Sequence, residues 1–194
     1  LFFSGAYKDG TYRISQNGID VGSFFGQGAF AEYAIVDARN AVKIVGVPDE
    51  KIKYLCSLGC GVQTGAGAVL NRCKPEPAST LVVFGVGGVG MAAVMAAKIA
   101  GCVKIIAVDI VPERLELARE FGATDTINAK EVSDVVSRIK DLTDGGAHYS
   151  VEVSGDPSVS LQAIKCLRRL GTAVVSSVTG PAEISIAIEG MLMN

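Results

Sequence analysis

The chain has 194 residues, 49% of them hydrophobic and 20% charged, with a formal net charge of -2 at pH 7. This composition predicts a soluble globular protein with enough apolar residues for a sizeable core. The nearly balanced charge gives no reason to expect nucleic acid or an anionic membrane surface as a partner. The longest apolar run, Met91–Ala97, is too short to span a membrane.

The cysteines predict a reducing compartment. There are 5 of them, an odd number, scattered and without a C-x-x-C pair, which favours free thiols and a cytoplasmic location. The single histidine, His148, cannot form a histidine-based metal site by itself. The cysteines are Cys56, Cys60, Cys73, Cys102 and Cys166.

The first third of the chain is expected to be rich in β-structure. Asp9-Gly10 and Asn17-Gly18 are strong turn signals, and the residues between them predict strands of a meander. Ala31–Val36 and Ala41–Val45 are predicted to be further strands. Pro48-Asp49-Glu50 predicts the start of a short helix, and a second helix is expected after Gly67, ending near Arg72.

From Thr80 onward the pattern alternates between apolar strands and helices. Such alternation predicts an α/β fold of the Rossmann type, a doubly wound parallel sheet with helices on both faces. Gly101, Gly122 and Gly171 stand where helices are expected to end. The predicted strands are Leu81–Phe84, Val103–Asp109, Thr124–Asn128, Tyr149–Val153 and Thr172–Val178, and the predicted helices are Val89–Ala100, Pro112–Phe121, Glu131–Leu142 and Ser158–Leu170.

The strongest functional signal is a glycine-rich turn directly after the strand Leu81–Phe84. The sequence Gly85-x-Gly87-x-x-Gly90 has the spacing of a dinucleotide-binding turn, in which the glycines allow a tight turn, a close approach of backbone to pyrophosphate, and close packing of helix on strand. Asp109 ends the next strand, where a carboxylate can bind the ribose hydroxyls. The combination predicts dinucleotide binding better than a turn that serves packing alone.

The chain is expected to be part of a longer protein. A doubly wound dinucleotide fold usually closes with a sixth parallel strand, whereas five precede the tail. That tail, Glu183–Glu189, alternates as a strand would. We therefore predict a partial β-rich segment at 1–57 and a dinucleotide-binding domain at 58–194 that lacks its last strand.

The chain resembles the zinc-dependent medium-chain alcohol dehydrogenases, most closely the branch that acts on aryl or benzyl alcohols. The resemblance covers essentially the whole chain, although members of the family are nearly twice as long. It implies that residues 1–57 are the end of the catalytic domain. The motifs that carry the resemblance, in chain order, are FFGQGAFAEY (24–33), LGCGVQTGAG (58–67), VFGVGGVG (83–90), AVDI (107–110) and EFGATD (120–125).

The resemblance implies that Cys60 is a catalytic zinc ligand. A zinc with an open position could bind the alcohol oxygen and lower its pKa. The family's other catalytic ligands, its structural zinc lobe and its proton-relay hydroxyl have no counterparts in this sequence. One thiolate does not hold a catalytic zinc, so we expect the 194-residue chain to bind no zinc at full strength and to show no turnover.

The resemblance carries the cofactor contacts over more completely. Asp109 would bind the adenosine ribose and repel a 2′-phosphate, so NAD is expected rather than NADP. Arg114 matches a basic residue near that ribose, and Thr64 and Val89 match residues near the nicotinamide. Val153 and Ser176–Val178 match further walls of the nicotinamide site. The predicted cofactor residues are Gly85, Val86, Gly87, Gly88, Val89, Gly90, Asp109, Arg114, Thr64, Val153, Ser176, Ser177 and Val178.

Phe24 and Phe25 match substrate-pocket positions of the family, and two adjacent rings suit a primary aromatic alcohol and its aldehyde. The alternating segment Ile184–Ile188 matches the edge strand through which the family dimerises, so a homodimer is expected. Three alternatives remain: a dinucleotide-binding module without chemistry, a zinc-independent quinone reductase, and a methyltransferase. The G-x-G-x-x-G spacing and the Gly-Cys-Gly at 59–61 argue against the methyltransferase.

Overall fold

The computed structural model describes residues 5–7, 9–23, 32–34, 36–178 and 183–186. The chain divides into two compact units, Leu1–Asp49 and Glu50–Asn194. The predicted assignment of 1–57 and 58–194 to two domains stays a prediction. In the described ranges, no helix is long and apolar enough to cross a membrane.

The first unit contains the predicted hairpin. Strands β1 (Ile14–Gln16) and β2 (Ile19–Val21) pair antiparallel. They are joined by Asn17 and Gly18, both with positive φ, as the tightest hairpin turns require. A short 3-10 helix, η2 (Ala38–Asn40), follows and is capped by Asp37.

Two predicted strands of this unit are wrong as far as the structure describes them. Ala41–Val45 is irregular, with Val42 87% and Val45 79% exposed. No neighbouring strand among the described residues pairs with it, so its apolar alternation has nothing to pack against. Residues 32–34 and 36 also lie outside any strand, and Ala31 and Ile35 fall outside the described residues.

The second unit opens with one nearly continuous helical segment where the sequence predicted two separate helices. Gly65 allows this segment to pack closely on α3, because a Cβ there would stand 1.9 Å from the carbonyl oxygen of Val89. The segment ends at Lys74 in a left-handed conformation, just before Pro75. It comprises α1 (Asp49–Ile52), η3 (Lys53–Ser57), η4 (Leu58–Val62), α2 (Gln63–Gly67) and η5 (Ala68–Cys73).

The core of the second unit is the predicted parallel sheet. Its strand order is β5-β4-β3-β6-β7, and all four pairings are parallel. The two central neighbours of β3 therefore bring their carboxyl ends to the same edge as the glycine turn. The strands are β3 (Thr80–Phe84), β4 (Lys104–Asp109), β5 (Asp125–Asn128), β6 (Ala147–Glu152) and β7 (Leu167–Val175).

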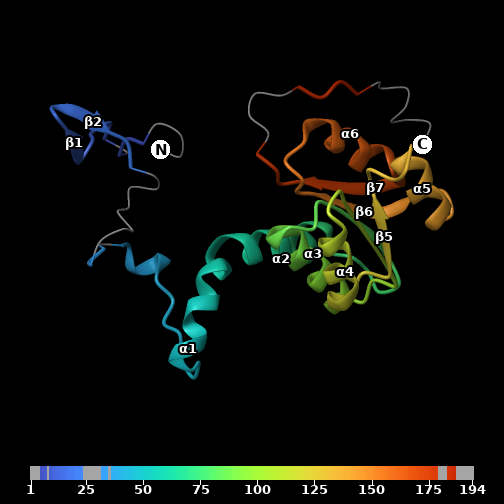
Figure 1. The fold of residues 1–194 in the computed structure, drawn as a ribbon, viewed down its shortest axis with the longest axis horizontal. Coiled ribbons are helices and arrows are strands. Elements are labelled where there is room, and N and C mark those ends of the chain that lie inside the picture. The colour runs from blue at the N-terminus through green and yellow to red at the C-terminus, as the bar shows by residue number, and fades with distance from the viewer. Residues whose placement is uncertain (1–4, 8, 24–31, 35, 179–182, 187–194) are drawn as a thin grey trace. The chain divides into compact units, whose positions relative to one another are not determined.

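Helices cover both faces of this sheet, which confirms the doubly wound fold (Figure 1). One buried cluster packs α3 (Gly88–Ile99) and α4 (Pro112–Phe121) on one face. The other packs α5 (Val135–Leu142) and α6 (Pro157–Lys165) on the opposite face. Fully buried Leu81 and Val83 point into the first cluster, and Val82 and Phe84 into the second.

Some boundaries differ from the sequence prediction. Helix α6 ends at Lys165 rather than Leu170, because Leu167 already pairs with Ala147 in the sheet. Gly171 consequently lies inside β7 and does not end a helix. Helix α5 begins at Val135 rather than Glu131, since Asp134 caps it by accepting a bond from the Ser137 N–H.

The predicted strand in the tail is also wrong in its described part. Residues 183–186 form no strand, and residues 187–189 lie outside the described residues.

Candidate functional site

The turn after β3 is shaped by contacts that only glycine permits. Gly85 has a φ of +83°, and a Cβ there would stand 2.7 Å from the Cα of Ser154. At Gly90 a Cβ would stand 1.9 Å from the carbonyl oxygen of Gly85 and 3.3 Å from Val153. Such separations exclude a side chain, so these two glycines allow the turn to pack against helix α3 and the segment after β6.

The other two glycines of the turn border open space. Gly87 precedes α3 as its N-cap, and a Cβ on Gly87 or Gly88 would meet nothing within 4 Å. The first backbone N–H groups of a helix have no acceptor within the helix, and the helix dipole makes this end positive. An anion such as a pyrophosphate could therefore approach the backbone here.

Asp109 holds the turn from the side of β4. Its side chain is 4% exposed, and Oδ2 accepts the N–H of Val86 at 2.7 Å. Oδ1 accepts the N–H groups of Ile110 at 2.7 Å and Val111 at 3.0 Å. An ionised carboxylate has about four acceptor positions, so these three bonds leave one of them open. Nη1 of Arg114 lies 3.9 Å from Oδ2.

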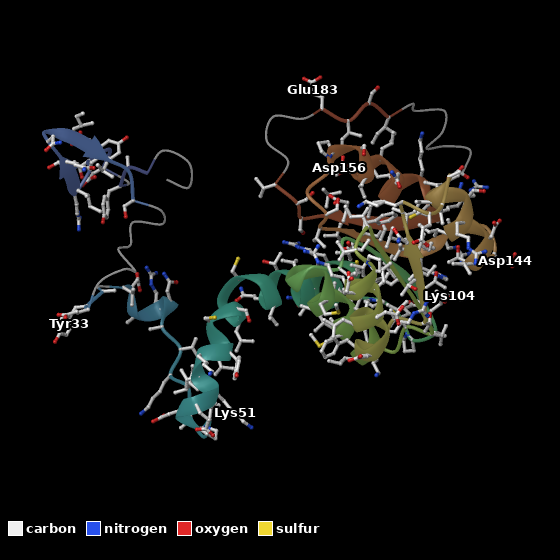
Figure 2. The ribbon with its side chains drawn as sticks, viewed as in Figure 1. Tyr33, Lys51, Lys104, Asp144, Asp156 and Glu183 are labelled. Atoms are coloured by element: carbon white, nitrogen blue, oxygen red, sulfur yellow. The ribbon has the colours of Figure 1, made fainter. Side chains whose placement is uncertain are left out.

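A pocket of about 540 Å³ opens at this carboxyl edge of the sheet. In Figure 2, Asp156 marks this edge, while Lys104, at the start of β4, marks the opposite one. Of the predicted cofactor residues, the pocket is lined by Gly85, Gly87, Asp109, Arg114 and Val153. The other lining residues were not predicted from the sequence; they are Phe84, Val108, Ile110, Ala129, Val132, Ser133, Asp134, Val135, Val136, Ser154, Asp156, Val159 and Gln162.

A simple signal could have found some of these. Ile110 and Ser154 directly follow Asp109 and Val153, and ligands of open α/β sheets bind beyond the carboxyl ends of the strands. The residues from α5 have no comparable signal, because they reach the pocket only through the way that helix packs on the sheet.

Of the residues predicted to surround the nicotinamide, Val153 lines this pocket, whereas Thr64, Val89 and Ser176–Val178 are not among its lining residues. The carbonyl oxygen of Val89 stands 1.9 Å from the point that a Cβ on Gly65 would occupy. Thr64, which precedes Gly65, is exposed. The segment Ser176–Val178 follows β7, and the Ser176 N–H donates to the carbonyl oxygen of Glu152 at 3.0 Å. Their roles toward a cofactor stay predictions.

Glu152, at the end of β6, was not singled out from the sequence. It is fully buried, and its carboxylate accepts four hydrogen bonds. Oε1 accepts from the N–H of Ser154 at 2.7 Å and from its hydroxyl at 2.6 Å. Oε2 accepts from the hydroxyls of Ser160 at 3.1 Å and of Ser177.

The described residues alone do not fit a zinc ion. Cys60 lies exposed on η4, and within the described ranges no three His, Cys, Asp or Glu side chains stand close enough to hold a metal. His148 lies at the start of β6, where Nδ1 is 2.8 Å from the Thr80 hydroxyl and Nε2 is 2.8 Å from Nη1 of Arg168. The predicted substrate residues Phe24 and Phe25 fall outside the described residues.

The sequence pattern of the zinc-binding dehydrogenase family matches residues 88–194, more than half of the chain. The chain belongs to this family. The matched region begins at the first residue of α3, so the positive helix end that faces the pocket lies at its start.

Individual members of the zinc-binding dehydrogenase family are similar over almost all of the chain. The class-3 alcohol dehydrogenase of Drosophila melanogaster is 40% identical over 185 residues, which are 93% of this chain and 48% of that protein. The chain thus spans about half the length of this relative.

Solved structures agree with this relationship. An alcohol dehydrogenase zinc-binding domain protein from Burkholderia ambifaria is 45% identical with a TM-score of 0.85, covering 100% of this chain and 52% of that one. Benzyl alcohol dehydrogenase from Acinetobacter calcoaceticus is 40% identical with a TM-score of 0.85, covering 98% of this chain and 51% of that one.

Proposed function

We propose that this chain is the coenzyme-binding part of an NAD-dependent alcohol dehydrogenase, and that NAD binds at the carboxyl edge of the sheet. The glycine turn carries this proposal, because it opens onto a pocket of about 540 Å³ beside the positive end of α3. A dinucleotide held there by the chain would supply the hydride acceptor for oxidation of an alcohol to its aldehyde, in which the hydroxyl proton is also released.

The chain's own residues would bind and orient the dinucleotide. Backbone N–H groups around Gly87 and Gly88 would donate to the pyrophosphate. Asp109 would accept a bond from an adenosine ribose hydroxyl through its remaining acceptor position, and Arg114 borders the same part of the pocket. Val153 and Ser177 would bound the nicotinamide half of the site.

The preference for NAD over NADP follows from the charge of Asp109. A 2′-phosphate on the adenosine ribose would stand beside this buried carboxylate, and two like charges at close range repel. Arg114 is half exposed and already faces the Asp109 carboxylate. The guanidinium therefore offsets only part of the repulsion.

The substrate proposal is a primary, aromatic alcohol. It is supported by the similarity to benzyl alcohol dehydrogenase and by the adjacent Phe24 and Phe25. Zinc ligation by Cys60 stays part of the proposal for the whole protein. The described residues do not complete a zinc site.

A homodimer is proposed through the end of the chain. Val178 is 81%, Ile184 40% and Ile186 37% exposed. Exposed apolar side chains that lie near one another are stabilised when a partner surface covers them. Sedimentation velocity of the chain should show a dimer, and a monomer at high protein concentration would count against this surface.

A binding titration tests the main proposal. The fluorescence of NADH should rise on addition of the chain, and NADPH should bind more weakly by at least roughly tenfold, equal to about 1.4 kcal/mol. A parallel assay with benzyl alcohol, NAD and added zinc tests for turnover. NADH binding without turnover is expected of this chain alone, whereas no binding of either nucleotide would overturn the proposed site.

A further inference from the structure

Glu152 is a buried carboxylate whose partners are all hydrogen-bond donors. One backbone N–H and three serine hydroxyls point at its two oxygens, two at each. No lysine or arginine within the described ranges makes an ion pair with it. An ionised carboxylate accepts and never donates, so this arrangement fills its four acceptor positions without a cation.

These four bonds join Glu152 to three segments, of which the one after β7 is 25 residues away in the chain. Ser154 belongs to the segment after β6, Ser160 to the first turns of α6, and Ser177 to the segment after β7. The main chain adds a fourth connection, since the Ser176 N–H donates to the Glu152 carbonyl oxygen. One side chain thus fixes the positions of both strand-end segments at this side of the pocket.

The segment held by Glu152 also contacts the glycine turn. The Cα and N atoms of Ser154 are the nearest neighbours of the position that a Cβ on Gly85 would occupy, at 2.7 and 2.9 Å. Val153, between Glu152 and Ser154, approaches Gly90 in the same way, at 3.3 Å. Val153 and Ser154 therefore form the pocket wall beside the turn, while the turn itself is held by the bond from the Val86 N–H to Asp109.

We propose that Glu152 is a positioning residue for the nicotinamide half of the cofactor site. It acts through Ser154 and Ser177, holding Val153 and the Ser176–Val178 segment at the separation that the nicotinamide ring requires. This inference rests on the proposed function, because it presumes that a dinucleotide occupies the pocket.

The test compares two ligands on the chain and on its Glu152→Gln variant. Glutamine has nearly the same volume as glutamate, but its NH₂ group cannot accept hydrogen bonds. The two donors that point at the replaced oxygen therefore lose their acceptor. NADH affinity should fall roughly tenfold, the equivalent of losing about one strong hydrogen bond. Affinity for ADP-ribose, which lacks the nicotinamide, should stay at the wild-type value. Glu152→Ala, which removes all four acceptors, should weaken NADH binding further.

Ser150→Ala is the matched control. Ser150 is fully buried on the same strand, and its hydroxyl donates to the Ala163 carbonyl oxygen of α6 at 2.6 Å. The control removes a buried β6–α6 hydrogen bond, so its Tm should fall while NADH affinity stays unchanged.

The outcomes separate the two proposals. Weaker NADH binding with unchanged ADP-ribose binding supports the positioning role. Wild-type NADH affinity in Glu152→Gln, or an equal loss for both ligands, overturns it. Failure of the unmodified chain to bind NADH would instead overturn the proposed function itself.

Discussion

The carboxylates of Asp109 and Glu152 stand on the two strands that flank β3, and each accepts a backbone N–H at 2.7 Å. Asp109 holds Val86, within the glycine turn, and Glu152 holds Ser154, which packs on Gly85. Asp109 thus holds the glycine turn itself, and Glu152 holds the pocket wall beside it.

The first prediction concerns Asp109→Asn. Asparagine keeps the shape of the aspartate side chain, but its NH₂ group must face at least one of the backbone N–H donors. The negative charge that repels a 2′-phosphate is also lost. NADH binding should weaken by roughly tenfold or more, while NADPH should lose less. Titration of both nucleotides measures this, with exposed Glu116→Gln as a charge-matched control. An unchanged ratio of the two affinities would contradict the assigned role.

The second prediction concerns two glycines of one turn. Gly90→Ala should lower the free energy of unfolding by about 1–3 kcal/mol, because the added methyl meets the Gly85 carbonyl oxygen. Gly88→Ala, whose Cβ meets nothing within 4 Å, should leave stability unchanged or raise it by up to about 1 kcal/mol through helix propensity. Urea unfolding of both variants measures the difference, and equal stabilities would show that the turn is looser than described.

The third prediction is a pH dependence that comes from His148. Burial lowers the pKa of its imidazole from 6.5 and the Arg168 guanidinium lowers it further, against a smaller opposing effect of Glu76. The unfolded chain therefore takes up this proton more readily, and stability should be lost as the pH falls from about 6.5.

The measurement is Tm from pH 7.5 to 5. The fall should be smaller in His148→Asn, which lacks the titrating group. The pKa values of the Asp9, Asp37 and Asp156 carboxyls are lowered by hydrogen bonds from Thr11, Arg39 and Ser158. Their contributions are lost below about pH 4, outside this window. Identical pH profiles of variant and wild type would refute the histidine as the source.

The fourth prediction concerns thiol reactivity. Cys56 and Cys60 are exposed, whereas Cys73 and Cys166 are buried. Burial raises the pKa of the Cys73 thiol to about 11 and that of Cys166 to about 12. At pH 8 the Cys73 thiolate is thus roughly one part in a thousand. Iodoacetamide should label Cys56 and Cys60 first, and it should label Cys73 and Cys166 only in urea. Mass spectrometry of the labelled protein identifies the modified cysteines.

The sheet and the glycine turn could be predicted because both have strong local signals. Leu81–Phe84 is a continuous apolar run, and Gly85 and Gly90 stand at spacings that only a tight turn and a packed helix explain. Pro112 and Gly122 mark the ends of α4, and the structure places that helix at Pro112–Phe121 as predicted.

The rest depends on contacts between distant residues. Leu167–Leu170 continues a helical pattern, yet Leu167 pairs with Ala147 and joins the sheet. Ala41–Val45 alternates without a partner among the described residues. Glu152 is the last residue of a strand of ordinary appearance, and only folding reveals that Ser154, Ser160 and Ser177 surround it. Of the pocket's lining residues, those of the glycine turn, Asp109, Arg114 and Val153 were predicted, whereas those that α5 and α6 contribute were missed.

The irregular start of β7 offers an attachment point for reporters. The pairing of β6 with β7 changes register near its start. Ala147 pairs with Leu167, but Tyr149 already pairs with Thr172, so Arg168–Gly171 bulge out of the ladder. Leu170 there is fully solvent-exposed, with a φ of 60°. The pocket lies at the other end of these strands, about 15 Å away at the usual rise per residue. A short epitope or a fluorophore grafted at Leu170 could follow sheet assembly without touching the bound nucleotide.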